Sequence, residues 1–133
     1  METDRRKSQR IRIDAVSQFL VSHDDRFEGD FEGLIENISD EGIGVVVNNP
    51  KYTSLVEGLS INNQFFFQAF DEYTAFKKPI SDIFQGKAKI VRIEKKNNHY
   101  YLGCKIVSSN HDLDEYISRR KMAFYIDGMA IAK

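Results

Sequence analysis

The residues best suited to chemistry are arginines near the start of the chain. Five of the eight residues from Arg5 to Arg12 are basic, although the net charge of the whole chain is only -1. Two of them, Arg6 and Arg10, have the spacing Arg-x-x-x-Arg. A guanidinium group is planar, permanently charged and forked, so it can grip a phosphate, bond the edge of a guanine or stack on its face. A ligand that needs two such groups is a phosphate-containing purine nucleotide.

A polar turn further along the chain supplies the second half of the candidate site. Asn37, Ser39 and Gly42 form the pattern Asn-x-Ser-x-x-Gly. The short polar side chains can donate to and accept from a base edge, and the glycine permits the backbone to turn or to approach a ligand closely. Each half also has a plainer interpretation. A basic N-terminal run is often a solvated tail, and such a turn can serve only its own hydrogen bonds.

Composition limits the class of protein. A chain of 133 residues with 41% hydrophobic and 29% charged residues fits one soluble globular domain, residues 1–133. Its apolar runs are far shorter than the roughly 20 residues that span a bilayer, and its N-terminus lacks the apolar segment of a secretory signal. The single cysteine excludes an internal disulfide and suits a reducing compartment. We therefore expect a cytoplasmic protein without direct membrane insertion.

Nothing in the sequence has the pattern of an active site. His23, His99 and His111 lack the paired spacing of metal ligands, and Cys104 alternates with apolar residues as a buried core thiol does. There is no Walker-type loop and no Rossmann-type glycine pattern. The sequence predicts no enzyme, no catalytic residue, no metal and no cofactor.

The elements that must position the two motifs are mostly strands. Apolar residues alternate with polar ones in the period of two that is typical of a strand with one buried face. Strands are expected at about 11–21, 31–38, 45–47, 60–70, 83–94 and 100–107. Residues 22–30 are expected to form a loop, 71–82 a long connection or protruding hairpin, and 50–58 a loop or a single helical turn. Six strands with short connections favour a small barrel or sandwich.

The C-terminal part changes to helical spacing. Leu113, Ile117 and Phe124 fall on one helical face, which predicts a helix over 111–126 that packs on the barrel. Acidic residues open this segment and basic residues lie in its second half, an order that complements the helix dipole. Asp112 and Glu115 are a candidate capping box, and Gly128 is the expected stop.

In this order and separation, the two motifs resemble those of the PilZ domain family. The segment from Gly86 to Ile93, followed by Tyr101 to Ile106, is similar to the final hairpin of the family. The resemblance covers nearly the whole chain. It implies an all-β fold with a C-terminal helix, in which residues 11–107 form a six-stranded antiparallel PilZ-type barrel. It further implies a bacterial receptor for the second messenger cyclic di-GMP, without catalytic activity.

The resemblance also implies a role for each residue. Arg6 and Arg10 hold phosphates and guanines, and Arg5 assists them from beside the motif. Asn37 and Ser39 bond a guanine, while Gly42 shapes the loop. Asn37 stands where many members have Asp, and an amide offers the guanine edge one acceptor where a carboxylate offers two.

A mechanism follows from this arrangement. Residues 1–10 are expected to form a flexible basic arm that folds onto the barrel rim when the ligand binds. The changed surface is then recognised by an unidentified effector protein.

Two other functions remain open. One is a PilZ-like adaptor that works through protein contacts and binds no nucleotide, and a ligand titration separates the two. The other is a nucleic-acid-binding barrel that uses the basic arm and exposed aromatic residues. The charge of -1 and eight acidic residues between Asp24 and Glu41 oppose binding to a nucleic acid polymer, which needs a broad basic surface. A small enzyme ranks behind both.

Overall fold

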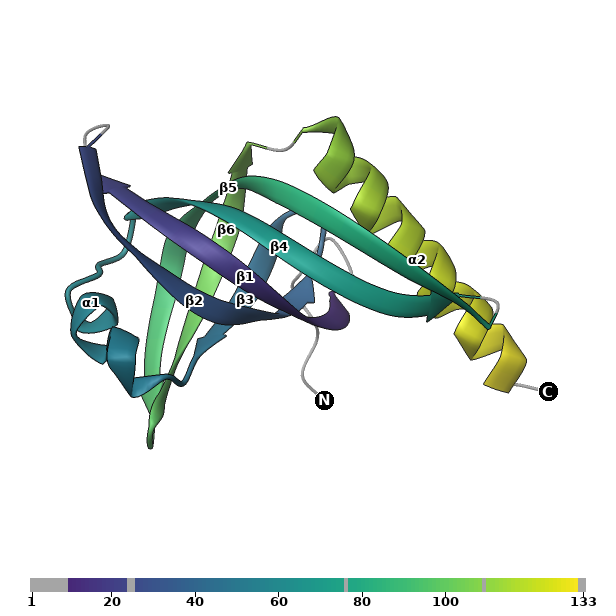
Figure 1. Ribbon diagram of the computed structural model, residues 1–133, viewed down its shortest axis with the longest axis horizontal. Coiled ribbons are helices and arrows are strands. Elements are labelled where there is room, and N and C mark those ends of the chain that lie inside the picture. Colours follow the sequence, from purple (N-terminus) through teal and green to yellow (C-terminus); the bar gives the residue numbers. More distant parts are fainter. Residues whose placement is uncertain (1–9, 24–25, 76, 109, 132–133) are drawn as a thin grey trace, which may run out of the picture.

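The protein is a closed antiparallel barrel with a helix at one end (Figure 1). The computed structural model describes residues 10–23, 26–75, 77–108 and 110–131. Its strands are β1 (Ile11–His23), β2 (Arg26–Ile38), β3 (Gly42–Val47), β4 (Gln64–Ala75), β5 (Lys78–Lys96) and β6 (His99–Ser108). They close in the order β1, β2, β3, β6, β5, β4, and every neighbouring pair is antiparallel. The six-stranded barrel predicted from the sequence is confirmed.

Aromatic side chains fill the barrel. Alternate residues of each strand point inward, so the period of two in the sequence becomes a continuous core. Phe19 stacks on Phe31 with ring centroids 4.8 Å apart and meets Phe65 edge-on at 5.1 Å. Cys104 is 2% exposed, which confirms that it is a core thiol. Burial of these rings excludes water from the barrel interior and fixes the register of its strands.

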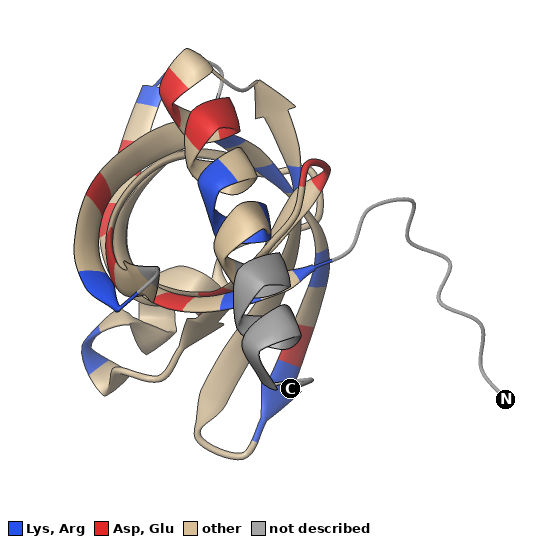
Figure 2. Cartoon of the chain, turned by 90° about the vertical axis from the view of Figure 1, so that its right-hand side faces the viewer, with Lys and Arg blue, Asp and Glu red and all other residues tan. Residues whose placement is uncertain are grey.

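The helix α2 (His111–Ile131) lies across one end of the barrel (Figure 2). Tyr116 stacks on Phe84 of β5 at 3.9 Å, and Leu113 and Ile117 are buried beside it. The apolar face predicted from helical spacing is therefore the face that packs on the barrel, although the side chain of Phe124 lies outside the described residues. No helix in the described part of the chain is long and apolar enough to cross a membrane.

Two details of the predicted helix are wrong. Its cap is Asn110, whose Oδ1 accepts a hydrogen bond from the backbone N–H of Leu113 at 2.9 Å, and Glu115 pairs with Arg119 instead of closing a capping box. The helix also continues through Gly128 to Ile131. A glycine inside a helix costs about 1 kcal/mol relative to alanine but does not by itself end it.

The barrel strands are longer than the sequence indicated. β2 begins at Arg26 inside the expected loop, and β4 with β5 extends over the expected connection 71–82 as a hairpin, one of the alternatives considered. This segment is rich in charged residues and contains Pro79, so its composition resembles that of a loop. Residues 50–58 form a 3-10 turn, η1 (Pro50–Tyr52), and a short helix, α1 (Thr53–Glu57).

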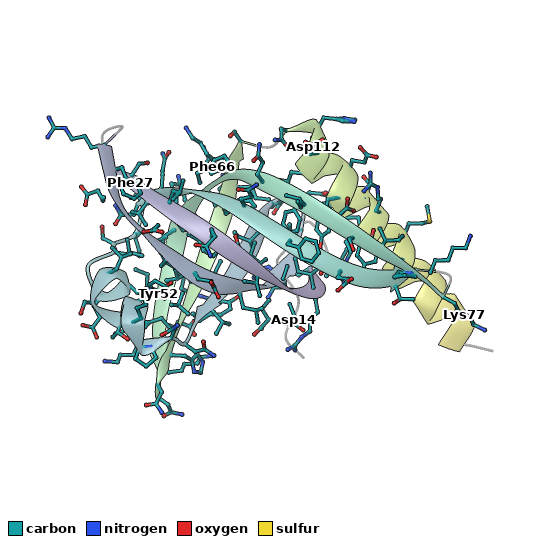
Figure 3. All side chains as sticks on the ribbon, viewed as in Figure 1. Asp14, Phe27, Tyr52, Phe66, Lys77 and Asp112 are labelled. Atoms are coloured by element: carbon teal, nitrogen blue, oxygen red, sulfur yellow. The ribbon has the colours of Figure 1, made fainter. Side chains whose placement is uncertain are left out.

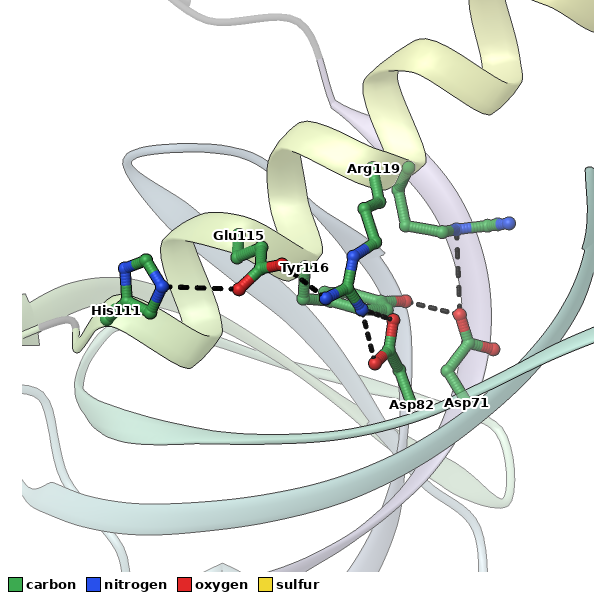
Figure 4. A network of polar contacts seen from close by, with 7 residues as sticks. Asp71, Asp82, His111, Glu115, Tyr116 and Arg119 are labelled. Carbon is green, nitrogen blue, oxygen red and sulfur yellow. Dashed lines mark hydrogen bonds and ion pairs between the residues drawn. The ribbon is translucent and has the colours of Figure 1, made fainter.

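A polar network joins the extended hairpin to α2 (Figure 4). Asp71 of β4 is 4% exposed, and its carboxylate accepts a short hydrogen bond from the hydroxyl of Tyr116. Arg120 Nε lies 3.5 Å from the same carboxylate, and the guanidinium lies 4.4 Å from the ring centroid of Tyr73. Burial and the Asp71 carboxylate raise the pKa of Tyr116, so this hydroxyl stays protonated and donates. The hairpin is ordered because the helix supplies partners for its inward polar groups.

Two adjacent arginines of α2 allow a matched test of this network. Arg120→Ala leaves Asp71 buried without its cation, and we expect the free energy of unfolding to fall by about 3 kcal/mol. Arg119 pairs with Asp82 and Glu115 at the surface, so Arg119→Ala should change stability much less. Urea unfolding of both variants measures the difference. Equal losses would show that the buried pair does not anchor the helix.

Candidate functional site

Arg10 is the described residue of the N-terminal motif, and it lies against the polar turn. Its Nη1 donates to Asn37 Oδ1 at 3.1 Å and to the hydroxyl of Tyr101 at 3.2 Å. These partners come from β2 and β6, and the three residues are far apart in the sequence. Arg5 and Arg6 lie outside the described residues. The structure thus brings together Arg10 and Asn37 as the sequence predicted, and adds Tyr101.

A glycine of β3 makes room for this cluster. Gly44 is the register partner of Asn37 on β2 and of Gly103 on β6. A Cβ atom on Gly44 would overlap the Tyr101 hydroxyl and would lie 2.8 Å from Asn37 Nδ2. Without that Cβ, both side chains lie flat on the backbone, where they meet the guanidinium of Arg10.

Ser39 organises the turn that carries the second motif. Its Oγ accepts hydrogen bonds from the backbone N–H groups of Glu41 and Gly42, each at 3.2 Å, and its own N–H donates to the carbonyl of Gly42 at 2.9 Å. Ser39 is 3% exposed. The serine therefore builds the turn, and its hydroxyl hydrogen is the group left to donate elsewhere.

Gly42 acts through packing against the neighbouring strand. It begins β3 and pairs with Lys105 of β6, and a Cβ atom here would overlap the carbonyl of Cys104. Gly42 has no positive φ, so its backbone conformation does not by itself require glycine, and its close approach to a ligand stays a prediction. The close approach in the structure is to β6, and it holds the turn at the barrel rim.

Arg92 is a second guanidinium near Arg10 that the motifs do not include. It projects from β5, with its Cζ 5.4 Å from the ring centroid of Tyr101, and its side chain is 56% exposed. Its Nε also pairs with Glu94 at 3.0 Å. Tyr101 therefore lies between two guanidinium groups, bonded to one through its hydroxyl and covered by the other on its face. Tyr101 and Arg92 come from segments distant from both motifs, so only the pairing register of β3, β5 and β6 could have identified them.

The helix α2 touches both segments that carry the motifs. Lys121 Nζ lies 2.5 Å from Asp40 Oδ2 at the tip of the turn, and Arg120 Nη2 donates to the carbonyl of Arg12 at 3.0 Å. Next to Arg12, Asp14 adopts a left-handed backbone (φ 54°) at an irregularity in the β1–β2 ladder. The candidate site is therefore bordered by the basic half of the helix (Figure 2).

The chemistry available here is recognition of an anion. The guanidinium groups of Arg10 and Arg92 both contact Tyr101 at the barrel rim, and the amide of Asn37 lies beside Arg10. Cys104 lies beneath the turn, and burial raises the pKa of its thiol to about 12, an effect that the charge of Arg10 opposes only in part. The thiol is therefore protonated and unsuited to nucleophilic attack. Among the residues that the structure describes, no cluster of His, Cys, Asp and Glu could hold a metal ion.

Known proteins provide an independent comparison with this fold and site. A sequence model of the PilZ domain matches residues 4–120. No curated protein matches the chain in sequence. Among solved structures, the PilZ domain of YcgR from Escherichia coli with c-di-GMP superposes with a TM-score of 0.58 at 14% identity, covering 96% of this chain and 95% of that one.

Two longer proteins contain the same fold. The inhibitor of motility (MotI/DgrA) of Bacillus subtilis gives a TM-score of 0.55 at 19% identity over 90% of this chain, and the MrkH–c-di-GMP complex of K. pneumonia gives 0.51 at 17% identity over 98%. The chain spans about half the length of each, 53% and 54%. Together with the match over residues 4–120, the barrel shows that this chain belongs to the PilZ domain family.

Proposed function

We propose that this chain is a receptor for cyclic di-GMP, and that it binds the ligand at the barrel rim through Arg5, Arg6, Arg10, Asn37, Ser39 and Gly42. One observation carries the proposal: Arg10 of one motif is held against Asn37 of the other. Two motifs that are distant in sequence thus form one polar surface with a fixed guanidinium. The YcgR and MrkH structures, which share the fold, contain c-di-GMP.

Each described residue has a distinct part in the proposed site. Arg10 contacts phosphate or guanine, and Tyr101 holds its fork in place. Asn37 presents one acceptor and one donor to the guanine edge. Ser39 bonds the base through its free hydroxyl hydrogen while its oxygen maintains the turn, and Gly42 contributes by keeping that turn close to β6.

The rest of the proposal concerns how the signal leaves the site. Residues 1–10 form a basic arm that closes over the bound ligand, with Arg10, which already contacts Asn37 and Tyr101, as its anchored end. An effector protein then recognises the altered surface. The protein acts in the cytoplasm by binding, without catalysis and without a cofactor. The adaptor function, in which no nucleotide binds, is the alternative that the first experiment below decides.

The decisive variant is at Arg10. Calorimetric titration should show saturable binding of cyclic di-GMP and none of GTP, and Arg10→Ala should abolish detectable binding while the barrel stays folded. Arg10→Lys should raise the dissociation constant by a factor greater than roughly three, which is a loss of about 0.65 kcal/mol in binding free energy. The reason is that an ammonium cannot stack or form a fork. Arg26→Ala, which removes an exposed arginine of β2, is the control and should bind normally. A wild-type protein that does not bind would favour the adaptor.

Ser39→Ala separates the two roles of that residue. Loss of the hydroxyl leaves the buried N–H of Gly42 without its acceptor, so the free energy of unfolding should fall by about 1–2 kcal/mol. Ser81→Ala, at an exposed position of β5, is the control for stability. Affinity should fall as well if the hydroxyl also bonds the guanine. Unchanged affinity with a clear loss of stability would assign Ser39 to the turn alone.

The arm is tested by amide exchange. In residues 5–9, exchange should be fast in the free protein and should slow when cyclic di-GMP is added. The β1–β2 ladder, which begins at Ile11, and the β5–β6 ladder should be protected in both states, since their hydrogen bonds belong to the barrel. Equal protection of residues 5–9 with and without ligand would remove arm closure from the mechanism, whatever the affinity.

A further inference from the structure

The outer face of β2, β1, β4 and β5 carries an exposed apolar patch. These strands are neighbours in the barrel, with β1 and β4 in the centre of the face (Figure 1). Val16 is 53% exposed, Phe70 50% and Ile83 63%, and they line a shallow groove of about 410 Å³. α2 leaves this face uncovered, because it packs on the inward residues of the barrel end. A patch of this kind on a soluble domain marks an interaction site.

The strand register arranges the outward side chains of this face in rows that cross all four strands (Figure 3 labels Phe66 among them). From β2 through β1 and β4 to β5, the rows are Asp30, Leu20, Phe66 and Lys87; Glu32, Gln18, Gln68 and Gln85; and Leu34, Val16, Phe70 and Ile83. The β2 edge therefore carries two carboxylates, the β5 edge carries one lysine, and the centre is largely apolar. If a row is turned around and laid on itself, Asp30 meets Lys87 and apolar residues meet apolar residues.

We propose that this face binds a second copy of the chain in a symmetric dimer whose twofold axis runs parallel to the strands. Such an axis places β2 of one copy over β5 of the other and β1 over β4, and it keeps every row opposite itself. Leu20 then packs on the partner's Phe66, and Val16 packs on the partner's Phe70. Asp30 lies opposite the partner's Lys87. Each of these contacts occurs twice.

The charges favour a second copy over an unrelated partner. Within the described residues, Asp30 and Lys87 form no ion pair in their own chain, whereas Glu32 accepts a hydrogen bond from Gln18 at 3.1 Å. A basic partner would match the β2 edge but would place like charge against Lys87, and an acidic partner would do the reverse. A second copy places Asp30 against Lys87 at both edges at once. It therefore gives Asp30, part of the acidic stretch between Asp24 and Glu41, a specific partner.

The size of the face sets the expected strength. Four strands about 4.8 Å apart, over the roughly five residues of about 3.3 Å each that the rows span, give a footprint on the order of 300 Å² per copy. This is below the about 800 Å² per partner of a standard stable interface, so the dimer should be weak, with a dissociation constant in the micromolar range. The dimer should form and dissociate with concentration.

Analytical ultracentrifugation of the full chain, from about 1 to about 500 µM, spans the expected constant. Val16→Glu should raise the dissociation constant at least roughly tenfold, because it puts two carboxylates into the apolar centre. Val107→Glu is the matched control, since Val107 is a 47% exposed valine on β6, outside the face, and this variant should dimerise normally. A wild-type protein that stays monomeric throughout, or equal behaviour of the two variants, would overturn the proposal.

A charge exchange tests the geometry of the dimer and does not depend on how well Val16→Glu folds. Asp30→Lys and Lys87→Asp should each weaken the dimer roughly tenfold, because each places like charges in contact twice. The double variant reverses both edges and should recover the wild-type constant within roughly threefold. Additive weakening in the double variant would contradict the twofold arrangement.

Discussion

The candidate site depends on β3, which pairs with β2 on one side and with β6 on the other. Asn37 and Tyr101 meet Arg10 over Gly44, where a Cβ atom would overlap the Tyr101 hydroxyl and crowd the amide of Asn37. Two residues before Gly44, Gly42 must also be a glycine, because a Cβ atom there would overlap the carbonyl of Cys104. The two motifs are therefore connected through the sheet itself. A guanidinium that is already hydrogen-bonded in position loses less conformational freedom when it binds an anion.

The second constraint is the docking of α2 on the barrel end. Stacking of Tyr116 on Phe84 places the basic half of the helix beside the site, where Lys121 reaches Asp40 and Arg120 reaches the carbonyl of Arg12. The buried Asp71 and Tyr116 pair fixes the depth of the helix. The contacts of α2 therefore serve three purposes. They complete the core, hold the extended hairpin and place positive charge beside the site.

Local patterns in the sequence predict much of this fold. Alternation of inward residues predicts most of the strands, because burial of one face imposes a period of two, and the β-branched run 45–47 predicts the third. The sequence leaves 71–82 open between a connection and a hairpin, since its stabilising partners Tyr116 and Arg120 lie in the distant helix and its own composition is typical of a loop. The motifs identified Arg10 and Asn37, yet Tyr101 and Arg92 belong to the site through register alone. Arg5 and Arg6 rest on the motif alone, since they lie outside the described residues.

The central claim is that cyclic di-GMP binds at the corner where Arg10, Asn37 and Tyr101 meet. The most direct test is a titration of the isotope-labelled full chain with cyclic di-GMP, followed through its backbone amide resonances. We expect shifts that concentrate at residues 10–12, 37–44 and around Tyr101, while resonances of the outer face, such as Leu20 and Phe66, stay in place. Shifts confined to other parts of the barrel, or none at saturating ligand, would contradict it.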